Sequence, residues 1–97
     1  MSFIQIIEFS TSRFEEGGQY IEEYRKATEG RRTTKRVRVG QDRDNPGRYF
    51  TIAEFDSYED AMRNSELPET TKLSQQLAGL ADGPPKFYNL EVVHDES

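Results

Sequence analysis

The segment Arg48–Ser65, RYFTIAEFDSYEDAMRNS, decides the fold that this sequence predicts. Its first part, Tyr49–Phe55, is rich in aromatic and β-branched residues and is apolar or neutral on both alternating faces, which is typical of a central strand. Asp56 or Ser57 follows, with an acidic residue three positions later, and this pattern marks the start of a helix. The segment therefore predicts a covered strand that leads directly into a helix.

The same arrangement occurs once earlier in the chain. The strand-like run Phe3–Phe9 ends in IIEF, much as the later run ends in IAEF, and a helical pattern follows it. Ser12 and Glu15 have the spacing of a capping box at the start of that helix. Two strand–helix units that end alike predict a duplicated βα architecture.

Two further strands complete the pattern. Thr33–Val39 has basic side chains on one face, which is typical of a sheet edge, and the turn 45–47 (NPG) returns the chain as a hairpin. Pro68 predicts the first turn of another helical segment, and Lys86–Val93 is the last predicted strand. The order βαββαβ predicts an α+β, ferredoxin-like fold with a four-stranded antiparallel sheet and its helices on one face. From the crossover rule we expect the two central strands, 3–9 and 49–55, to be neighbours and to run parallel.

The composition fits a single domain over residues 1–97 with a modest core. Only 33% of the residues are apolar and the mean hydropathy is −0.91, so the core is small or is completed by a second chain. Both faces of the central strands are apolar, yet helices are expected on only one of them. The uncovered face predicts a homodimer formed through the open face of the sheet.

Several classes of protein are excluded at this point. The absence of cysteine excludes disulfides and thiolate metal sites, and the spacing of His, Asp and Glu predicts no metal centre. The net charge of −5 disfavours general nucleic-acid binding. No signal peptide and no apolar run long enough to span a bilayer is present. We expect a soluble, cytoplasmic protein with no metal, nucleic-acid or membrane partner.

The hairpin and its flanks resemble a known family. The residues 42–50 (DRDNPGRYF), then Glu54-Phe55, then 58–62 (YEDAM), are similar to the dimeric α/β-barrel proteins, in particular the antibiotic-biosynthesis-monooxygenase-like (ABM-like) branch. The resemblance spans most of the chain in element order and is specific over residues 42–67. It implies a homodimeric α/β barrel. Such proteins include cofactor-free oxygenases, haem-degrading enzymes, isomerases and proteins of no known activity, so the fold does not determine the activity.

The resemblance also bears on cofactors and substrate. Haem-degrading relatives use an Asn, a Trp and a helical His, whereas this chain has no tryptophan and its single histidine, His94, follows the last strand. No haem or other cofactor is therefore expected. Cofactor-free oxygenase relatives hold a phenolic substrate with a polar residue of the second helix, often with a tryptophan. Asn64 occupies about that place, which implies a cofactor-independent monooxygenase acting on a flat aromatic or polyketide-like molecule.

Asn64, Arg63 and Tyr49 are the candidate catalytic residues. An asparagine can hold an oxyanion or a hydroxyl, and an arginine can hold a phenolate or carboxylate. The alternative is that Asn64 is simply the C-terminal residue of its helix, a common position for asparagine.

Small side chains in the middle of the second central strand predict a cavity that aromatic residues line. The candidate substrate-binding residues are Gln5, Tyr24, Thr51, Ala53 and Phe55. The alternative is that the helices or a partner sheet pack more closely on these small residues.

A pair of carboxylates offers a further candidate. Glu8 and Glu54 end the two central strands and could supply a general base if they lie together; otherwise each pairs with an arginine such as Arg36 or Arg38. Two functions thus stay open: an enzyme of the monooxygenase-like branch, and a non-catalytic small-ligand-binding or assembly domain of the same fold. The missing tryptophan favours the second, and the position of Asn64 favours the first.

Overall fold

Strands and helices follow one another in the predicted βαββαβ order, with the second helical segment divided at Pro68. A computed structural model describes residues 2–96. Pro68 is the first residue of the last helix, as predicted, because its missing N–H is not needed there. The elements are β1 Phe3–Ser10, α1 Phe14–Ala27, β2 Thr34–Gln41, β3 Arg48–Phe55, α2 Tyr58–Ser65, α3 Pro68–Ala78 and β4 Lys86–Glu91.

The four strands form one antiparallel sheet in the order β2-β3-β1-β4. The prediction that β1 and β3 are central neighbours is confirmed, but the prediction that they run parallel is wrong. Phe3 lies opposite Phe55 and Phe9 lies opposite Tyr49, so the two strands are antiparallel. The reason is that the α1 crossover passes over one position of the sheet. It places β2 parallel to β1 but not beside it, and β3, the hairpin partner of β2, fills the gap in the opposite direction.

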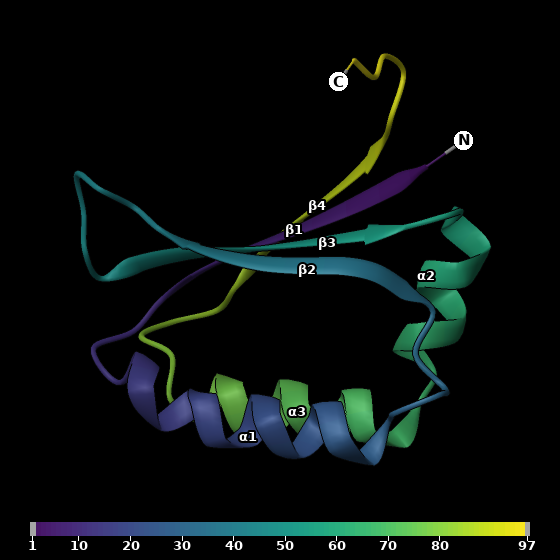
Figure 1. The fold of residues 1–97 in the computed structure, drawn as a ribbon. Coiled ribbons are helices and arrows are strands. Elements are labelled where there is room, and N and C mark those ends of the chain that lie inside the picture. Colours follow the sequence, from purple (N-terminus) through teal and green to yellow (C-terminus); the bar gives the residue numbers. More distant parts are fainter. Residues whose placement is uncertain (1, 97) are drawn as a thin grey trace.

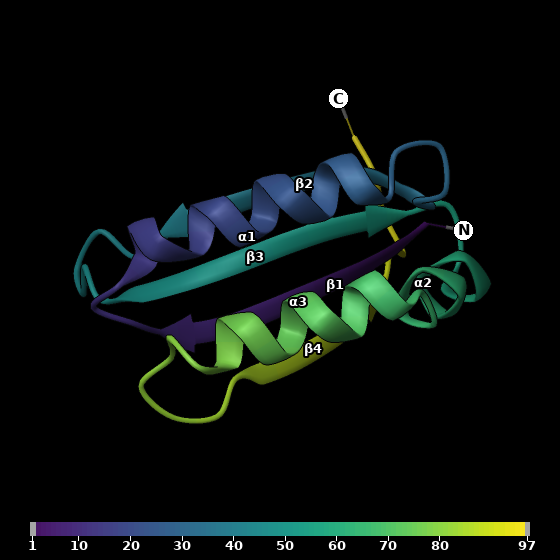
Figure 2. The same ribbon diagram turned by 90° about the horizontal axis from the view of Figure 1, so that it is seen from below.

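The helices cover one face of the sheet, and the other face is open (Figure 1). Seen from below, α1 runs under β2 and β3 while α3 runs under β1 and β4 (Figure 2). The short helix α2 stands at one end of the sheet and connects the two layers (Figure 1). Among residues 2–96 no helix is both long and apolar enough to cross a membrane.

The buried core sits at the α2 end of the sheet. It consists of Phe3, Ala53, Phe55 and Ala61, with Met62 packed against it. The rings of Phe3 and Phe55 are 6.3 Å apart between centroids. Towards the other end of β3, Thr51 and Tyr49 are on the same face of the sheet but are only partly buried. The helix-facing side of the sheet is therefore well packed at one end only.

The start of α1 differs from the prediction, because Ser12 and Glu15 form no capping box. Arg13 is the N-cap residue, and no side chain caps the helix within the described residues. The buried hydroxyl of Thr11 takes over part of this role, since its Oγ1 accepts a hydrogen bond from the Arg13 N–H at 2.9 Å. The predicted cap of α2 is confirmed: the Ser57 hydroxyl accepts from the Asp60 N–H at 3.1 Å.

Candidate functional site

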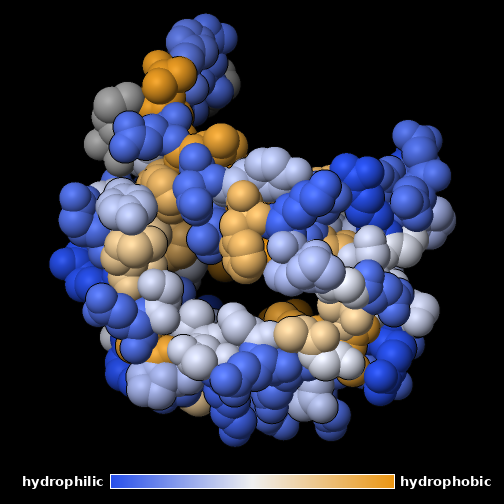
Figure 3. All heavy atoms as spheres, turned by 180° about the vertical axis from the view of Figure 1, so that it is seen from behind, coloured by the Kyte–Doolittle hydropathy of each residue, from blue (hydrophilic) through white to orange (hydrophobic). Residues whose placement is uncertain are grey.

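A cleft separates the sheet from the helix layer. The backbones of α1 and α3 lie close to each other and approach the strands at few points. The space-filling view shows the molecule hollowed between the two layers (Figure 3). The close approach of the helices depends on Gly17, where an added Cβ would lie 3.1 Å from Leu77 Cδ2. The two helices thus pack on each other and leave part of the strand surface uncovered.

The mouth of this cleft lies where the start of α1 faces β2 and β3. It is an open groove of about 550 Å³, a volume within the range of about 300–1,000 Å³ that small-molecule sites occupy. The side chains that line it are polar or aromatic except for Val39: Ser12, Arg13, Phe14, Glu15, Glu16, Val39, Gln41 and Tyr49.

The cleft continues inwards as a narrow apolar part of about 40 Å³. The residues that line only this inner part come from β1 and the turn after it, β3, α1, and α3 and the turn after it: Phe9, Thr11, Gly17, Ile21, Thr51, Leu77 and Leu80. A polar mouth that leads to an apolar interior suits a small molecule with one polar edge.

Three aromatic rings are stacked on one another in this region. Tyr49 is stacked on Phe14, with centroids 4.3 Å apart and an interplanar angle of 9°. Its other neighbour is Phe9, at 5.6 Å and 18°. The Tyr49 hydroxyl accepts a hydrogen bond from Gln41 Nε2 at 3.3 Å, and this fixes its position in the mouth. An aromatic ligand can pack against such rings edge-to-face or in an offset stack.

The predicted substrate-binding residues do not all lie at the cleft. Thr51 lines its apolar part, whereas Ala53 and Phe55, on the same face of β3, belong to the buried core beside α2. Gln5 lies opposite Ala53 and donates from Nε2 to Asn89 Oδ1 at 3.2 Å.

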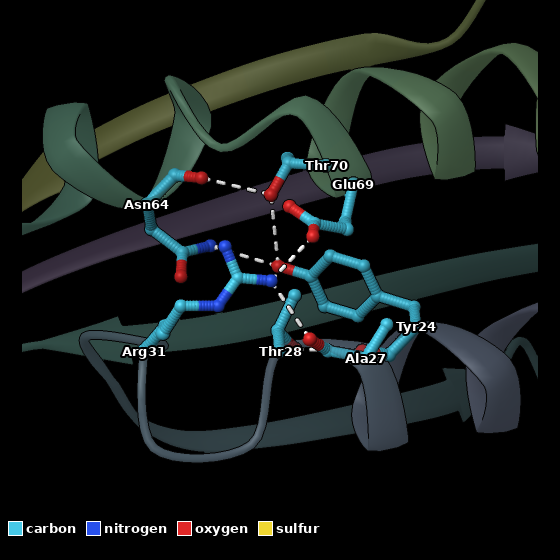
Figure 4. A network of polar contacts seen from close by, with 7 residues as sticks. All are labelled: Tyr24, Ala27, Thr28, Arg31, Asn64, Glu69 and Thr70. Atoms are coloured by element: carbon cyan, nitrogen blue, oxygen red, sulfur yellow. Dashed lines mark hydrogen bonds and ion pairs between the residues drawn. The ribbon is translucent and has the colours of Figure 1, made fainter.

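Asn64 is buried in a closed hydrogen-bond network that joins α1, α2 and α3 (Figure 4). Its Oδ1 accepts from the Thr33 N–H at 3.3 Å, which fixes the orientation of the amide because a reversed amide would present a donor to a donor. Its Nδ2 donates to the Tyr24 hydroxyl at 3.2 Å. The Thr70 hydroxyl donates to the Asn64 carbonyl at 2.8 Å, so Tyr24, 2.9 Å from Thr70 Oγ1, is the donor in that pair.

An ion pair lies next to this network. Arg31 pairs with Glu69 and also donates from Nη2 to the Ala27 carbonyl at 2.7 Å, which joins the end of α1 to the start of α3 (Figure 4). The hydrogen bond from Arg31 lowers the pKa of the Glu69 carboxyl below its ordinary value. Arg63 is exposed and pairs with Asp60 one turn earlier on α2.

The structure does not bring the three candidate catalytic residues together. Tyr49 lies at the cleft mouth, near the start of β3. Arg63 and Asn64 lie on α2, which follows the opposite end of that strand. The six residue steps along the strand from Tyr49 to Phe55 correspond to about 20 Å. A site built on Tyr49 therefore uses different neighbours, of which Arg13, Phe14 and Gln41 were not singled out from the sequence.

The two strand-end carboxylates lie apart as well. Glu8 is opposite Phe50 and Glu54 is opposite Ile4, so the two glutamates are four positions apart along the β1–β3 ladder. Each pairs with an arginine: Glu8 Oε2 lies 3.3 Å from Arg48 Nε, and Glu54 Oε1 lies 3.0 Å from Arg38 Nη2. The alternative reading, ion pairing rather than a shared base, is the one that the structure supports. Within residues 2–96 no His, Asp and Glu cluster has the arrangement to hold a metal ion.

Comparison with known proteins identifies the fold. No protein-family model and no curated protein sequence matches this chain. Similar solved structures include a protein of Nitrosomonas europaea provisionally named an antibiotic biosynthesis monooxygenase, at 14% identity and a TM-score of 0.79 over 99% of this chain and 94% of that one. A mutant of SnoaB, a cofactor-independent oxygenase from Streptomyces nogalater, matches at 13% identity with a TM-score of 0.81, over 97% of this chain and 95% of that one. Rv0793 from Mycobacterium tuberculosis matches at 12% identity with a TM-score of 0.80, over 100% of both chains.

The predicted resemblance is thus confirmed at the level of the fold. Residues 2–96 have a ferredoxin-like α+β fold that is similar to the folds of these structures. Sequence identities of 12–14% concern the fold alone.

Proposed function

We propose that this protein is a cofactor-independent monooxygenase that binds a flat aromatic or polyketide-like molecule in the cleft between the sheet and the helices. The observation that carries the proposal is the cleft of about 550 Å³ with Tyr49 and Phe14 stacked at its mouth. The likeness of the fold to a cofactor-independent oxygenase supports it.

The proposed reaction uses only the substrate and O2. A phenol, as its phenolate, supplies two hydrogen atoms and the electrons. One oxygen atom of O2 becomes a second ring carbonyl, so that the product is a quinone, and the other leaves as water. The protein has to bind the ring, hold the phenolate oxygen and exclude water from the reacting carbon.

Tyr49 is the candidate catalytic residue best placed for this role, because it lines the mouth and its hydroxyl is held by Gln41. Thr51 contributes to the apolar part of the binding surface. For Asn64 we propose a structural role in the network with Tyr24, because neither residue is among the described residues that line the cleft. Arg63 is left without a supported role in the cleft.

We infer that the protein works as a homodimer through the open face of the sheet. The cross-strand register brings six apolar or aromatic side chains together on that face: Ile4, Ile6, Phe50, Ile52, Tyr88 and Leu90. Tyr88 and Leu90 are 42% and 45% exposed in the single chain, and a second sheet would cover them. The dimer is tested by sedimentation of Ile52→Asp. The exposed α3 variant Thr71→Asp is the control, and a wild-type monomer at micromolar concentration contradicts the inference.

The proposed activity is tested by oxygen uptake with 1-naphthol as probe. One O2 consumed per quinone formed, with one atom of labelled O2 in the quinone and one in water, is the expected result. Tyr49→Phe should lower the rate while leaving the fold intact. Uptake equal to the protein-free background in wild type contradicts the proposal.

A second candidate function is a non-catalytic domain that binds a small aromatic ligand. The observation that favours it is Asn64, whose amide oxygen accepts from the Thr33 N–H and whose amide nitrogen donates to Tyr24 (Figure 4 shows the second bond). Saturable 1-naphthol binding without oxygen uptake would support this second function over the first.

A further inference from the structure

Arg13 is placed to interact with whatever the cleft holds. It lines both the mouth and the apolar part, and among the described lining residues it is the only basic one. The next residue, Phe14, is stacked on Tyr49. Arg13 therefore directly precedes one of the aromatic rings of the mouth.

The backbone of Arg13 is fixed from two sides. Its N–H donates to Thr11 Oγ1 at 2.9 Å, and the same hydroxyl donates to the Leu80 carbonyl at 2.6 Å. The Thr11 N–H in turn donates to the Gly47 carbonyl at 2.9 Å, which connects this point to the β2–β3 hairpin. The base of the side chain is therefore held at the cleft while its charged end can move.

The charged end has one ion-pair partner in the described chain, Glu16, one helical turn further on α1. Arg13 Nη2 lies 2.5 Å from Glu16 Oε2, and the two side chains are 54% and 55% exposed. An ion pair this exposed contributes little to stability. A guanidinium has five N–H donors, and a carboxylate can accept from two of them in one plane. A carboxylate or phenolate oxygen of the ligand can therefore replace Glu16 as the partner of Arg13.

We propose that Arg13 is the specificity-determining residue of the cleft and selects flat aromatic ligands that carry an anionic oxygen, a carboxylate or phenolate, at one edge. Glu16 is then the internal partner that holds Arg13 when the cleft is empty. The inference rests on the proposed function, because it requires that the cleft binds a flat aromatic molecule.

The acidic side chains of the mouth do not reverse this preference. Glu16 pairs with Arg13 in the empty cleft, and when Arg13 turns to a ligand the Glu16 side chain, 55% exposed, is screened by solvent. Glu15 lies in the first turn of α1, where a carboxylate interacts favourably with the helix N-terminus. A preference for cationic ligands is the alternative, and the experiment below includes it as an outcome.

The test compares three fluorescent probes of one shape: anthracene-2-carboxylate, the neutral anthracene-2-carboxamide and the cationic 2-(aminomethyl)anthracene. Each is titrated into wild type, Arg13→Gln, Glu16→Gln and Arg25→Gln. Arg25 is the matched control because it forms the same kind of ion pair on α1, with Glu22 three residues earlier and side chains 57% and 51% exposed, away from the cleft.

Wild type is expected to bind the carboxylate about tenfold more tightly than the carboxamide. Arg13→Gln should abolish this ratio, Glu16→Gln should increase it, and Arg25→Gln should leave it unchanged. Equal binding of the carboxylate and carboxamide by wild type, a ratio retained by Arg13→Gln, or tightest binding of the amine overturns the inference while ligand binding in the cleft stands. Failure of all three probes to bind overturns the proposed function, and the inference with it.

Discussion

Tyr49 of β3 lies flat against Phe14 of α1, with the two ring centroids 4.3 Å apart. This contact connects the sheet to the helix layer at the end where the buried core is absent. It places two aromatic rings at the mouth of the cleft. The stack therefore contributes both to stability and to the shape of the proposed binding site.

Removing one ring of the stack should weaken ligand binding more than it weakens the fold. Phe14→Ala is expected to reduce affinity for anthracene-2-carboxamide about tenfold, because a flat ligand loses one of its stacking surfaces. Tyr58→Ala is the control, since Tyr58 packs against Phe3 outside the cleft. Fluorescence titration checks both variants, and equal losses in the two would contradict a binding role for the stack.

The network around Asn64 should contribute to stability. Asn64→Ala removes the partner of the Thr33 N–H and of the Tyr24 hydroxyl, so the free energy of unfolding should fall by about 1–3 kcal/mol. Ser65→Ala, at the next and exposed position, should change it by less than about 1 kcal/mol. Urea unfolding measures both, and an unchanged midpoint for Asn64→Ala would rule out this structural role.

The two adjacent glycines of α1 should respond in opposite ways. A Cβ at Gly18 meets no other described atom within 4 Å, so Gly18→Ala should stabilise the protein by about 0.5–1 kcal/mol through helix propensity. A larger side chain at Gly17 meets Leu77, so Gly17→Val should destabilise by about 1–3 kcal/mol and displace Leu77 within the apolar part of the cleft. Thermal unfolding of both variants decides, and a stabilising Gly17→Val would show that the helices do not pack as described.

Tyr88 gives a prediction for alkaline pH. Its hydroxyl donates to Glu8 Oε1 at 3.0 Å, and this hydrogen bond raises the pKa of Tyr88 above its ordinary value. Because the folded pKa is the higher one, the contribution to stability is complete below the unfolded pKa of about 10 and is lost as the pH rises through the folded pKa. Glu8→Gln should lower the pKa of Tyr88, as measured by tyrosinate absorbance with Tyr88→Phe as the reference. An unchanged titration curve in Glu8→Gln would contradict the assigned cause.

Local patterns in the sequence were sufficient to predict the elements and their order. The signals are short-range: Tyr49–Phe55 is apolar or neutral on both faces, Ser57 is a cap, and Pro68 is in a first turn. The structure confirms a central strand, the cap and the helix start. The direction of the central strands was predicted wrongly because it depends on how many positions of the sheet a crossover passes over, which no local signal encodes.

The cleft could be predicted only in part, because it is made by segments distant in the chain. Thr51 and Tyr49 were found from the small and aromatic residues of one strand. Arg13 and Gln41 join them only through the packing of α1 and β2 around that strand. Asn64 is an equally clear case: its partners Thr33 and Tyr24 are 31 and 40 residues away, and no spacing rule connects them.

The central claim is that a flat aromatic molecule binds between the sheet and the helices, and methyl NMR of the protein titrated with 1-naphthol tests it most directly. The account predicts that the methyl signals of Val39, Leu77 and Leu80, which line the cleft, shift in a saturable way. The signals of Leu90 and Val93, which do not line the cleft, should stay in place. Saturable shifts at Leu90 or Val93, with none at the three cleft residues, would contradict the claim.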